Sequence, residues 1–136
     1  MEEIKAAEET IFHLVNRERA GAGRKPLVWD SRAGKVAREH SRLMATQWFF
    51  SHMDRNGNYT GDRLRAAGIS WRWVGENIYS HHDREDTATS SVQGWMRSAG
   101  HRENILSTNF THTGIGVETA ADGTVYCTQV FFRPAN

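Results

Sequence analysis

Two histidines and one glutamate in this sequence have side chains suited to metal or proton chemistry. His52, Glu76 and His101 each lie beside a glycine or a serine, close to a predicted turn or to the edge of a predicted helix or strand. Side chains at such edges tend to line clefts rather than fill cores. Because two imidazoles and a carboxylate can hold a divalent metal ion or move a proton, we predict that the three residues share one cleft.

The two histidines favour a weak zinc site. An imidazole has an ordinary pKa of about 6.5, so at neutral pH it is largely uncharged and can bind zinc through a ring nitrogen. His52 and His101 are the candidate ligands, with water and Glu76 around them. A site with two protein ligands is open, and we expect it to bind Zn²⁺ weakly and not to be required for folding.

Glu76 carries most of the physical argument for a site. A buried carboxylate without a partner is costly, so Glu76 must face a wet cleft or find a cationic or donor group, for which His52 and His101 are the candidates. A second function uses the same residues. In a zinc-dependent hydrolase, His52 and His101 would hold the metal and Glu76 would activate water as a general base.

Other interpretations remain open. The three residues could tie three loops together by hydrogen bonds alone, or the useful surface could lie elsewhere. Ser51 and Ser98 lie close in sequence to the histidines, but no Gly-x-Ser-x-Gly elbow and no orienting carboxylate accompany them. The His-Glu-x-x-His signature of zinc proteases is absent. We favour the cleft, since titratable groups at element edges more often form clefts than cores.

Helices are expected to supply most of the framework. Apolar residues at steps of three and four predict a first helix that ends before Gly21, and Asp30 can cap a second helix. His40 falls on the apolar stripe of that second helix, and we interpret it as a buried, hydrogen-bonded structural residue. Further helices are predicted over about 62–67 and from Asp86 to Gly100, with a short turn or helix from residue 101 to 106.

Strands are expected around Glu76 and near the C-terminus. Residues 73–79 predict a strand in which Glu76 shares a face with Val74 and Ile78. Segments 114–119 and 125–132 are joined by Asp122-Gly123, a strong hairpin signal. The run 48–50 is a candidate exposed lip of the cleft. The large aromatic residues expected in the core are Trp29, Trp73, Trp95, Phe110, Phe131 and Phe132.

Composition limits the partners of the chain. Its 136 residues fit one domain, and 17 basic against 16 acidic residues leave a formal net charge of +1. This balance does not favour nucleic acid as a partner, and we interpret Arg63 and Arg65 as a solvated helix face. No apolar run is long enough to cross a bilayer. Cys127, the single cysteine, cannot form an internal disulfide, and we expect it to behave as a small buried hydrophobe.

Six segments, in their order along the chain, resemble the CAP superfamily of cysteine-rich secretory proteins, antigen 5 and pathogenesis-related 1 proteins. They are Leu14-Val15-Asn16-Arg17-Glu18-Arg19, Pro26-Leu27-Val28-Trp29-Asp30, Gly75-Glu76-Asn77-Ile78, Trp95-Met96-Arg97-Ser98, Gly114-Ile115-Gly116-Val117 and Tyr126-Cys127-Thr128-Gln129-Val130-Phe131. The resemblance covers nearly the whole chain and is closest to bacterial, SCP-like members. It implies a single domain over residues 1–136 and an α+β fold, a three-layer α-β-α sandwich around a small, mostly antiparallel sheet.

The resemblance also bears on the site. The family cavity carries two histidines and two glutamates, and His52, Glu76 and His101 match three of these positions. Ser98 stands at the fourth, which is a glutamate in eukaryotic members. Serine supplies no negative charge, so a bound metal would be less well neutralised and a paired-carboxylate mechanism is not available.

We therefore expect a secreted bacterial domain that binds a ligand through a cleft of His52, Glu76, Ser98 and His101 rather than an enzyme. The resemblance implies a lipid, peptide or protein ligand and an extracytoplasmic location, and the lack of a disulfide framework favours a bacterial source. The first residues lack the pattern of a secretory signal, so we interpret Met1 as the start of a fragment from which a leader was removed. A cytoplasmic protein is the alternative.

Overall fold

A computed structural model describes residues 2–82 and 86–136, with side chains from residue 5 onward. Along the described chain the elements are α1 (Glu2–Gly21), β1 (Val28–Trp29), α2 (Ser31–Gln47), α3 (Thr60–Ala66), β2 (Trp71–His81), α4 (Thr87–Met96), α5 (Ala99–Leu106), β3 (His112–Thr119) and β4 (Val125–Pro134). Asp30 and Asp86 begin α2 and α4 as expected, because their carboxylates accept hydrogen bonds from the backbone N–H groups of Ala33 (2.9 Å) and Ala88 (3.1 Å).

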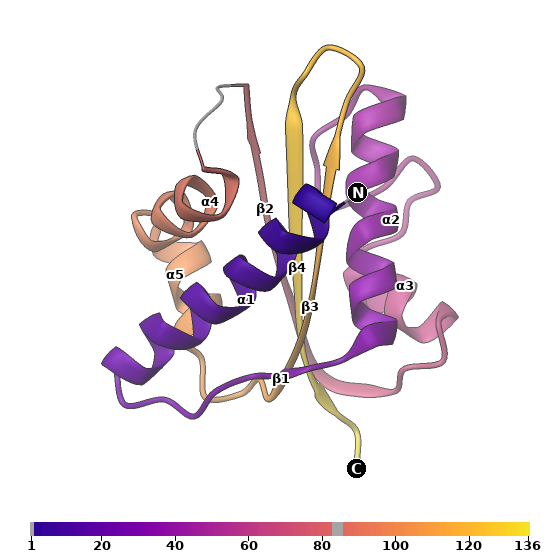
Figure 1. Ribbon diagram of the computed structural model, residues 1–136. Coiled ribbons are helices and arrows are strands. Elements are labelled where there is room, and N and C mark those ends of the chain that lie inside the picture. The colour runs from indigo at the N-terminus through magenta and orange to yellow at the C-terminus, as the bar shows by residue number, and fades with distance from the viewer. Residues whose placement is uncertain (1, 83–85) are drawn as a thin grey trace.

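The strands form a sheet in the order β1-β3-β4-β2, with helices on both faces. The β1–β3 pair is parallel, and the β3–β4 and β2–β4 pairs are antiparallel. Helices α1, α4 and α5 pack together on one face, while α2 and α3 cover the other (Figure 1). The predicted α+β fold, a three-layer α-β-α sandwich, is confirmed.

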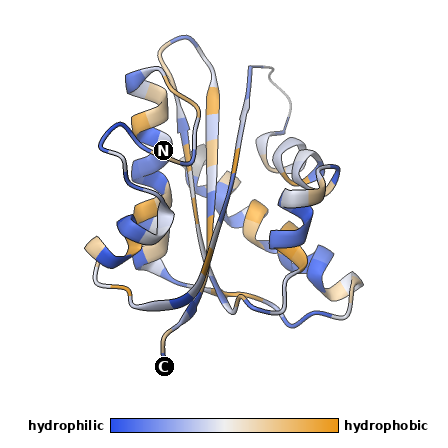
Figure 2. Ribbon diagram, turned by 180° about the vertical axis from the view of Figure 1, so that it is seen from behind, coloured by the Kyte–Doolittle hydropathy of each residue, from blue (hydrophilic) through white to orange (hydrophobic). Residues whose placement is uncertain are grey.

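Two hydrophobic cores fill the spaces between the layers. Along β4 the side chains alternate, so that Cys127 and Phe131 join the core beneath α1 and α4, whereas Val130 and Phe132 join the core beneath α2. Figure 2 shows hydrophobic segments along these strands, between the helical layers. Cys127 is fully buried, as expected of a small hydrophobe, and burial raises its pKa to about 12.

Two glycines let α2 lie directly on β3. A Cβ atom added at Gly114 would come within 2.2 Å of the backbone N of Gly34, and one added at Gly116 within 2.1 Å of the backbone of Arg38. The intervening residue, Ile115, points into the opposite core. The Gly-Ile-Gly-Val segment therefore fixes the close contact that holds α2 in place, and with it the segment that carries His52.

Three expectations about the elements differ from the structure. The helix predicted from Asp86 to Gly100 ends at Met96, because Ser98 is extended and α5 begins at Ala99. β1 was not predicted, since two residues are too few to show strand periodicity. Trp73 was expected in the core but is 47% exposed, because the β2–β4 register shifts between Trp71 and Trp73 and turns this end of the strand outward. Trp95, Phe110, Phe131 and Phe132 are buried as predicted, and Trp29 is half-buried.

Candidate functional site

Glu76 lies in the middle of β2, which is one edge strand of the sheet, β1 being the other. It pairs with Val130 of β4 and is 8% exposed. Neighbouring strand residues alternate between faces, and Val74, two positions before Glu76, packs on the core beneath α2. The carboxylate therefore enters the layer between the sheet and helices α2 and α3, as the strand pattern predicted.

Two side chains hold the Glu76 carboxylate. Nδ1 of His52 lies 2.9 Å from Oε1, and Nη2 of Arg63 donates to Oε2 at 2.7 Å. Burial raises the pKa of the Glu76 carboxyl, but the hydrogen bond from His52 and the charge of Arg63 outweigh it, so that the pKa lies below its ordinary value. Glu76 is thus ionised at neutral pH. Since an ionised carboxylate only accepts hydrogen bonds, Nδ1 of His52 carries the proton.

Arg63 was expected on a solvated helix face, and this prediction is wrong. Its side chain is 11% exposed, and besides Glu76 it donates to the backbone oxygens of His52 (3.0 Å) and Asn58 (2.8 Å) and to Oγ1 of Thr60 (3.1 Å). The available signal was its helical position, three residues after Thr60 on the inner face of α3. Arg65, in contrast, is exposed and lies over the Trp71 ring.

His40 supports the segment that carries His52. It is fully buried, and its Nε2 lies 2.8 Å from the backbone oxygen of Ser51, so the predicted structural role is confirmed. Burial lowers the pKa of His40, and the nearby charge of Glu76 opposes this effect without reversing it. His40 is therefore neutral at pH 7. Its N–H fixes the backbone immediately before His52.

His101 and Ser98 form a second pair at the start of α5. Nδ1 of His101 lies 2.8 Å from Oγ of Ser98, and the backbone oxygen of His101 accepts from Nδ2 of Asn77 on β2 (3.0 Å). Asn104 also bonds to Asn77, at 2.9 Å. Asn77 follows Glu76 and points to the other face of the strand, so α5 is anchored on the side opposite the Glu76 carboxylate.

The structure therefore divides the predicted site residues into two hydrogen-bonded pairs, His52 with Glu76 and His101 with Ser98. The pKa of His101 lies below its ordinary value, chiefly because of burial and to a lesser extent because of the charge of His52. Among the described residues, however, His101 makes no hydrogen bond to Glu76. A cavity of about 270 Å³ beside Glu76 is lined by His52, Tyr59, Thr60, Gly61, Val74, Gly75 and Glu76, without Ser98 or His101.

The two histidines are the candidate metal ligands among the predicted site residues. Within residues 5–82 and 86–136, no group of three or more His, Cys, Asp or Glu side chains is arranged to hold a metal ion. In the same ranges, Nε2 of His52 and Nε2 of His101 make no hydrogen bond, whereas the Nδ1 atoms are both engaged. These two Nε2 atoms are the ring nitrogens available to a metal, with Glu76 and Ser98 behind them.

The other candidates contribute less. Ser98 and His101 lie within hydrogen-bond distance, as a nucleophile and base would, but no described carboxylate bonds to His101 to orient it. In the predicted lip, Trp48 is 76% and Phe50 51% exposed, yet neither lines the cavity beside Glu76. The exposed aromatic residue that does is Tyr59, which the sequence analysis missed.

The profile of the CAP, or cysteine-rich secretory protein, family matches residues 12–131. The chain belongs to this family. It is 38% identical over 113 residues to YkwD of Bacillus subtilis, covering 83% of this chain and 43% of YkwD. It is 34% identical over 128 residues to the B. subtilis membrane protein YlbC, covering 93% and 34% of the two chains.

A solved structure of an extracellular protein containing an SCP domain, from Bacillus anthracis, superposes on this CAP domain with a TM-score of 0.84 and 33% identity. The match covers 95% of this chain and 41% of that one. The chain thus spans less than half the length of these three relatives. None of the helices that the structure describes combines the length and apolar character needed to span a membrane.

Proposed function

We propose that this chain is an extracytoplasmic bacterial CAP domain that binds a ligand or partner at a cleft of His52, Glu76, Ser98 and His101. We further propose that His52 and His101 bind a divalent metal ion weakly, zinc being the best candidate. The single observation that carries the proposal is the Arg63–Glu76–His52 chain, in which a buried ion pair positions a histidine whose side chain is 47% exposed.

The hydrogen bonds at both Nδ1 atoms support the metal assignment. A ring that donates from Nδ1 presents the Nε2 lone pair, and carboxylate–histidine pairs of this kind set the tautomer and orientation of many zinc ligands. Glu76 does this for His52, and the hydroxyl of Ser98 can do so for His101. Bound zinc would act as a Lewis acid and would polarise a carbonyl group of the bound partner or a water molecule. With two protein ligands and no second carboxylate, affinity is expected to be low.

The state of Glu76 favours binding over catalysis. A general base works best when its pKa lies near the working pH, and the pKa of Glu76 is lowered instead. Both of its oxygens already accept strong hydrogen bonds, from His52 and Arg63. The zinc-dependent hydrolase, with Glu76 as the base, is therefore the less favoured function.

The size and the lining of the cavity beside Glu76 limit the kinds of ligand that it can bind. A cavity of about 270 Å³ lies slightly below the usual range of about 300–1,000 Å³ for small-molecule sites. Tyr59, which is 55% exposed and lines the same cavity as His52, adds apolar surface, and so does Met53, which is 43% exposed and follows His52 in the sequence. Among lipid, peptide and protein ligands, these features favour a peptide or protein segment that inserts one side chain. The extracellular description of the B. anthracis relative supports a location outside the cytoplasm.

Calorimetric titration with Zn²⁺ tests this proposal. We expect weak one-to-one binding by the wild type and none by the His52→Ala, His101→Ala double variant, with little change in thermal midpoint. A matched double variant at two exposed histidines, His13→Ala with His82→Ala, should keep the wild-type affinity. Equal affinity in the two double variants would refute the metal assignment. Zinc-dependent peptide cleavage that is lost in Glu76→Gln would instead establish the hydrolase.

A further inference from the structure

A second concave surface lies far from the histidines in sequence. Residues from the end of α1, the loop to β1, the segment before β3 and the end of β4 surround a hollow of about 590 Å³, which we call the cationic hollow. These segments meet in the lower part of Figure 1. Its lining consists of Arg19, Gly23, Arg24, Lys25, Pro26, Val28, Thr108, Phe110, Thr111 and Arg133. Four of these side chains are cations, and none is a carboxylate.

The most buried of the four cations, Arg19, has only carbonyl partners. It is 3% exposed, and it donates to the backbone oxygens of Lys25 (2.7 Å), Ile105 (2.7 Å) and Ser107 (2.9 Å). No carboxylate of the described chain forms an ion pair with it, and its pKa is lowered, chiefly by burial and also by the charge of Arg24. A buried cation without a counter-charge is unfavourable, so an anion bound next to Arg19 would stabilise it.

Helix ends account for part of this positive charge. Arg24 donates to the backbone oxygen of Leu106 at 2.8 Å, so together with Arg19 it caps the C-terminal end of α5. Each helix C-terminus is equivalent to about half a negative charge, and the ends of α1 and α5 together supply about one. Four cations therefore exceed the local negative charge by about three. Capping explains why the arginines are held, but it does not neutralise them.

Several donors in the cationic hollow remain unused. Among the described residues, the ammonium of Lys25 and Nη2 of Arg24 make no hydrogen bond or ion pair. Arg133 is held from the other side, since it donates to the backbone oxygens of Asn109 (2.9 Å) and Thr108 (3.1 Å). The fixed guanidinium of Arg133 on β4, and the unused ammonium of Lys25 and Nη2 of Arg24 from the loop before β1, thus line the same hollow.

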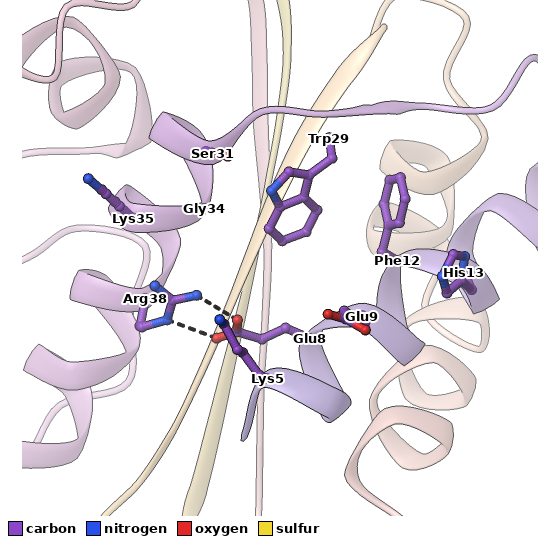
Figure 3. A pocket seen from close by; sticks show the side chains of 10 residues that line it. All are labelled: Lys5, Glu8, Glu9, Phe12, His13, Trp29, Ser31, Gly34, Lys35 and Arg38. Carbon is purple, nitrogen blue, oxygen red and sulfur yellow. Dashed lines mark hydrogen bonds and ion pairs between the residues drawn. The ribbon is translucent and has the colours of Figure 1, made fainter. Parts of the chain in front are cut away.

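A neighbouring pocket shows what a neutralised arrangement looks like. Between α1 and α2, a pocket of about 450 Å³ contains Lys5, Lys35 and Arg38, but also Glu8 and Glu9 (Figure 3). Nη2 and Nε of Arg38 donate to the two oxygens of Glu8 at 2.6 and 3.0 Å. Figure 3 shows the Lys5 side chain beside this pair. That pocket supplies its own counter-ions, whereas the cationic hollow does not.

We propose that the cationic hollow binds the phosphate group of a small organic phosphate. A phosphate carries up to two negative charges and several acceptor oxygens, which matches guanidinium and ammonium donors that converge from several directions better than a single carboxylate does. The hollow is larger than phosphate alone requires and falls within the usual range for small-molecule sites, about 300–1,000 Å³. Val28, 56% exposed, and Pro26 offer apolar surface to the organic part.

Titration with phenyl phosphate, followed by calorimetry and by amide NMR shifts, tests the assignment at an ionic strength of about 0.15 M. Inorganic phosphate and benzoate serve as probes for each half of the ligand. We expect saturable binding of phenyl phosphate, weaker binding of inorganic phosphate, weaker still of benzoate, and shifts centred on residues 19–28 and 108–111. Benzoate that binds as tightly as phenyl phosphate would overturn the phosphate assignment, and absence of saturation would overturn the site.

A pair of double variants separates the site from net charge. Arg24→Ala with Lys25→Ala should weaken phenyl phosphate binding by at least about tenfold, whereas Lys5→Ala with Lys35→Ala removes the same charge and should change it less than about twofold. Equal losses in both would mean unspecific attraction and would overturn the proposal. Lys25→Glu provides a second variant should Arg24→Ala impair folding, because Lys25 has no side-chain partner to lose. Unchanged affinity in Lys25→Glu would also overturn it.

Discussion

Two buried glutamates, Glu8 on α1 and Glu76 on β2, each pair with an arginine, yet they serve different ends. Glu8, 2% exposed, accepts a forked pair of hydrogen bonds from Arg38 and a third from the backbone N–H of Val117 (3.0 Å). Both partners belong to the framework, since these three hydrogen bonds join α1 to α2 and to β3. Glu76 accepts from Arg63 on one oxygen and from the half-exposed His52 on the other.

This difference shows how a scaffold carboxylate can be told from a site carboxylate. Burial and an arginine partner are common to both residues, so neither feature identifies function. What sets Glu76 apart is the chemistry of the exposed group that it holds: His52 has a ring nitrogen that can bind a metal ion or move a proton, whereas the Arg38 guanidinium held by Glu8 is a permanent cation. The ion pair with Arg63 holds the Glu76 carboxylate in a fixed position. The hydrogen bond from His52 to this carboxylate then fixes the orientation of the partly exposed imidazole.

The largest effect is expected from Glu8→Gln. The substitution leaves the Arg38 guanidinium without its counter-charge and weakens the acceptor of the Val117 N–H, so urea unfolding should show a loss of about 3 kcal/mol. Glu9→Gln on the same helix changes an exposed residue and should stay within about 0.5 kcal/mol of wild type. Equal stability of the two variants would mean that Glu8 is not the framework anchor that we describe.

Arg63→Met should have a smaller effect on stability and a second effect on the site. It leaves the buried Glu76 carboxylate without its cation, which should cost about 2 kcal/mol and raise the pKa of Glu76. Because His52 then loses a fixed partner, zinc affinity should fall by about tenfold. Arg72→Met, at an exposed position of β2, is the control. Wild-type zinc affinity in Arg63→Met would separate the ion pair from the site and contradict our account.

A mildly acidic pH should distinguish the two glutamates, because histidine occurs only in the Glu76 network. The pKa of His40 is lowered chiefly by burial, and Arg63 adds to this effect while Glu76 and Asp54 oppose it. Below about pH 6.5 the unfolded chain therefore binds a proton that the folded chain refuses, and stability falls with a slope of up to about 1.4 kcal/mol per pH unit. The pKa of His101 is also lowered, so this residue likewise makes the folded state less stable as the pH falls.

Urea unfolding of wild type and His40→Gln between about pH 5 and pH 6.5 measures this slope. The variant should be less stable at neutral pH, because it lacks the fitted imidazole, but its stability should depend less on pH. An identical slope in both proteins would show that His40 is not the titrating group. Such a result would leave the Glu8 and Glu76 networks undistinguished by pH.

Much of the fold could be predicted from local signals. Asp30 and Asp86 are strong helix starts, the Asp122-Gly123 turn forms the β3–β4 connection, and the alternation around Glu76 gives its face correctly. These signals act within a few residues and need no knowledge of the tertiary structure. β1 and the outward turn of Trp73 were missed, because both depend on the neighbouring strand rather than on their own sequence.

The site could be predicted only in part for a similar reason. Because burying a carboxylate is costly, the sequence correctly predicted that Glu76 has a partner, and it correctly named His52. The cationic partner, however, is Arg63, which was not predicted. A lone arginine on a short helix looks like a surface residue unless the position of that helix against β2 is known. His101 pairs with Ser98 instead of Glu76. This pairing could not be predicted either, because it depends on how Asn77 anchors α5.

Long-range proton–nitrogen NMR of the imidazole rings during a Zn²⁺ titration tests the central claim most directly. In the free protein we expect the proton of His52 on Nδ1, where Glu76 accepts it, and added zinc should shift Nε2 of both His52 and His101 while the other histidines stay unchanged. A proton on Nε2 of His52 in the free protein, or zinc shifts confined to other histidines, would contradict the account.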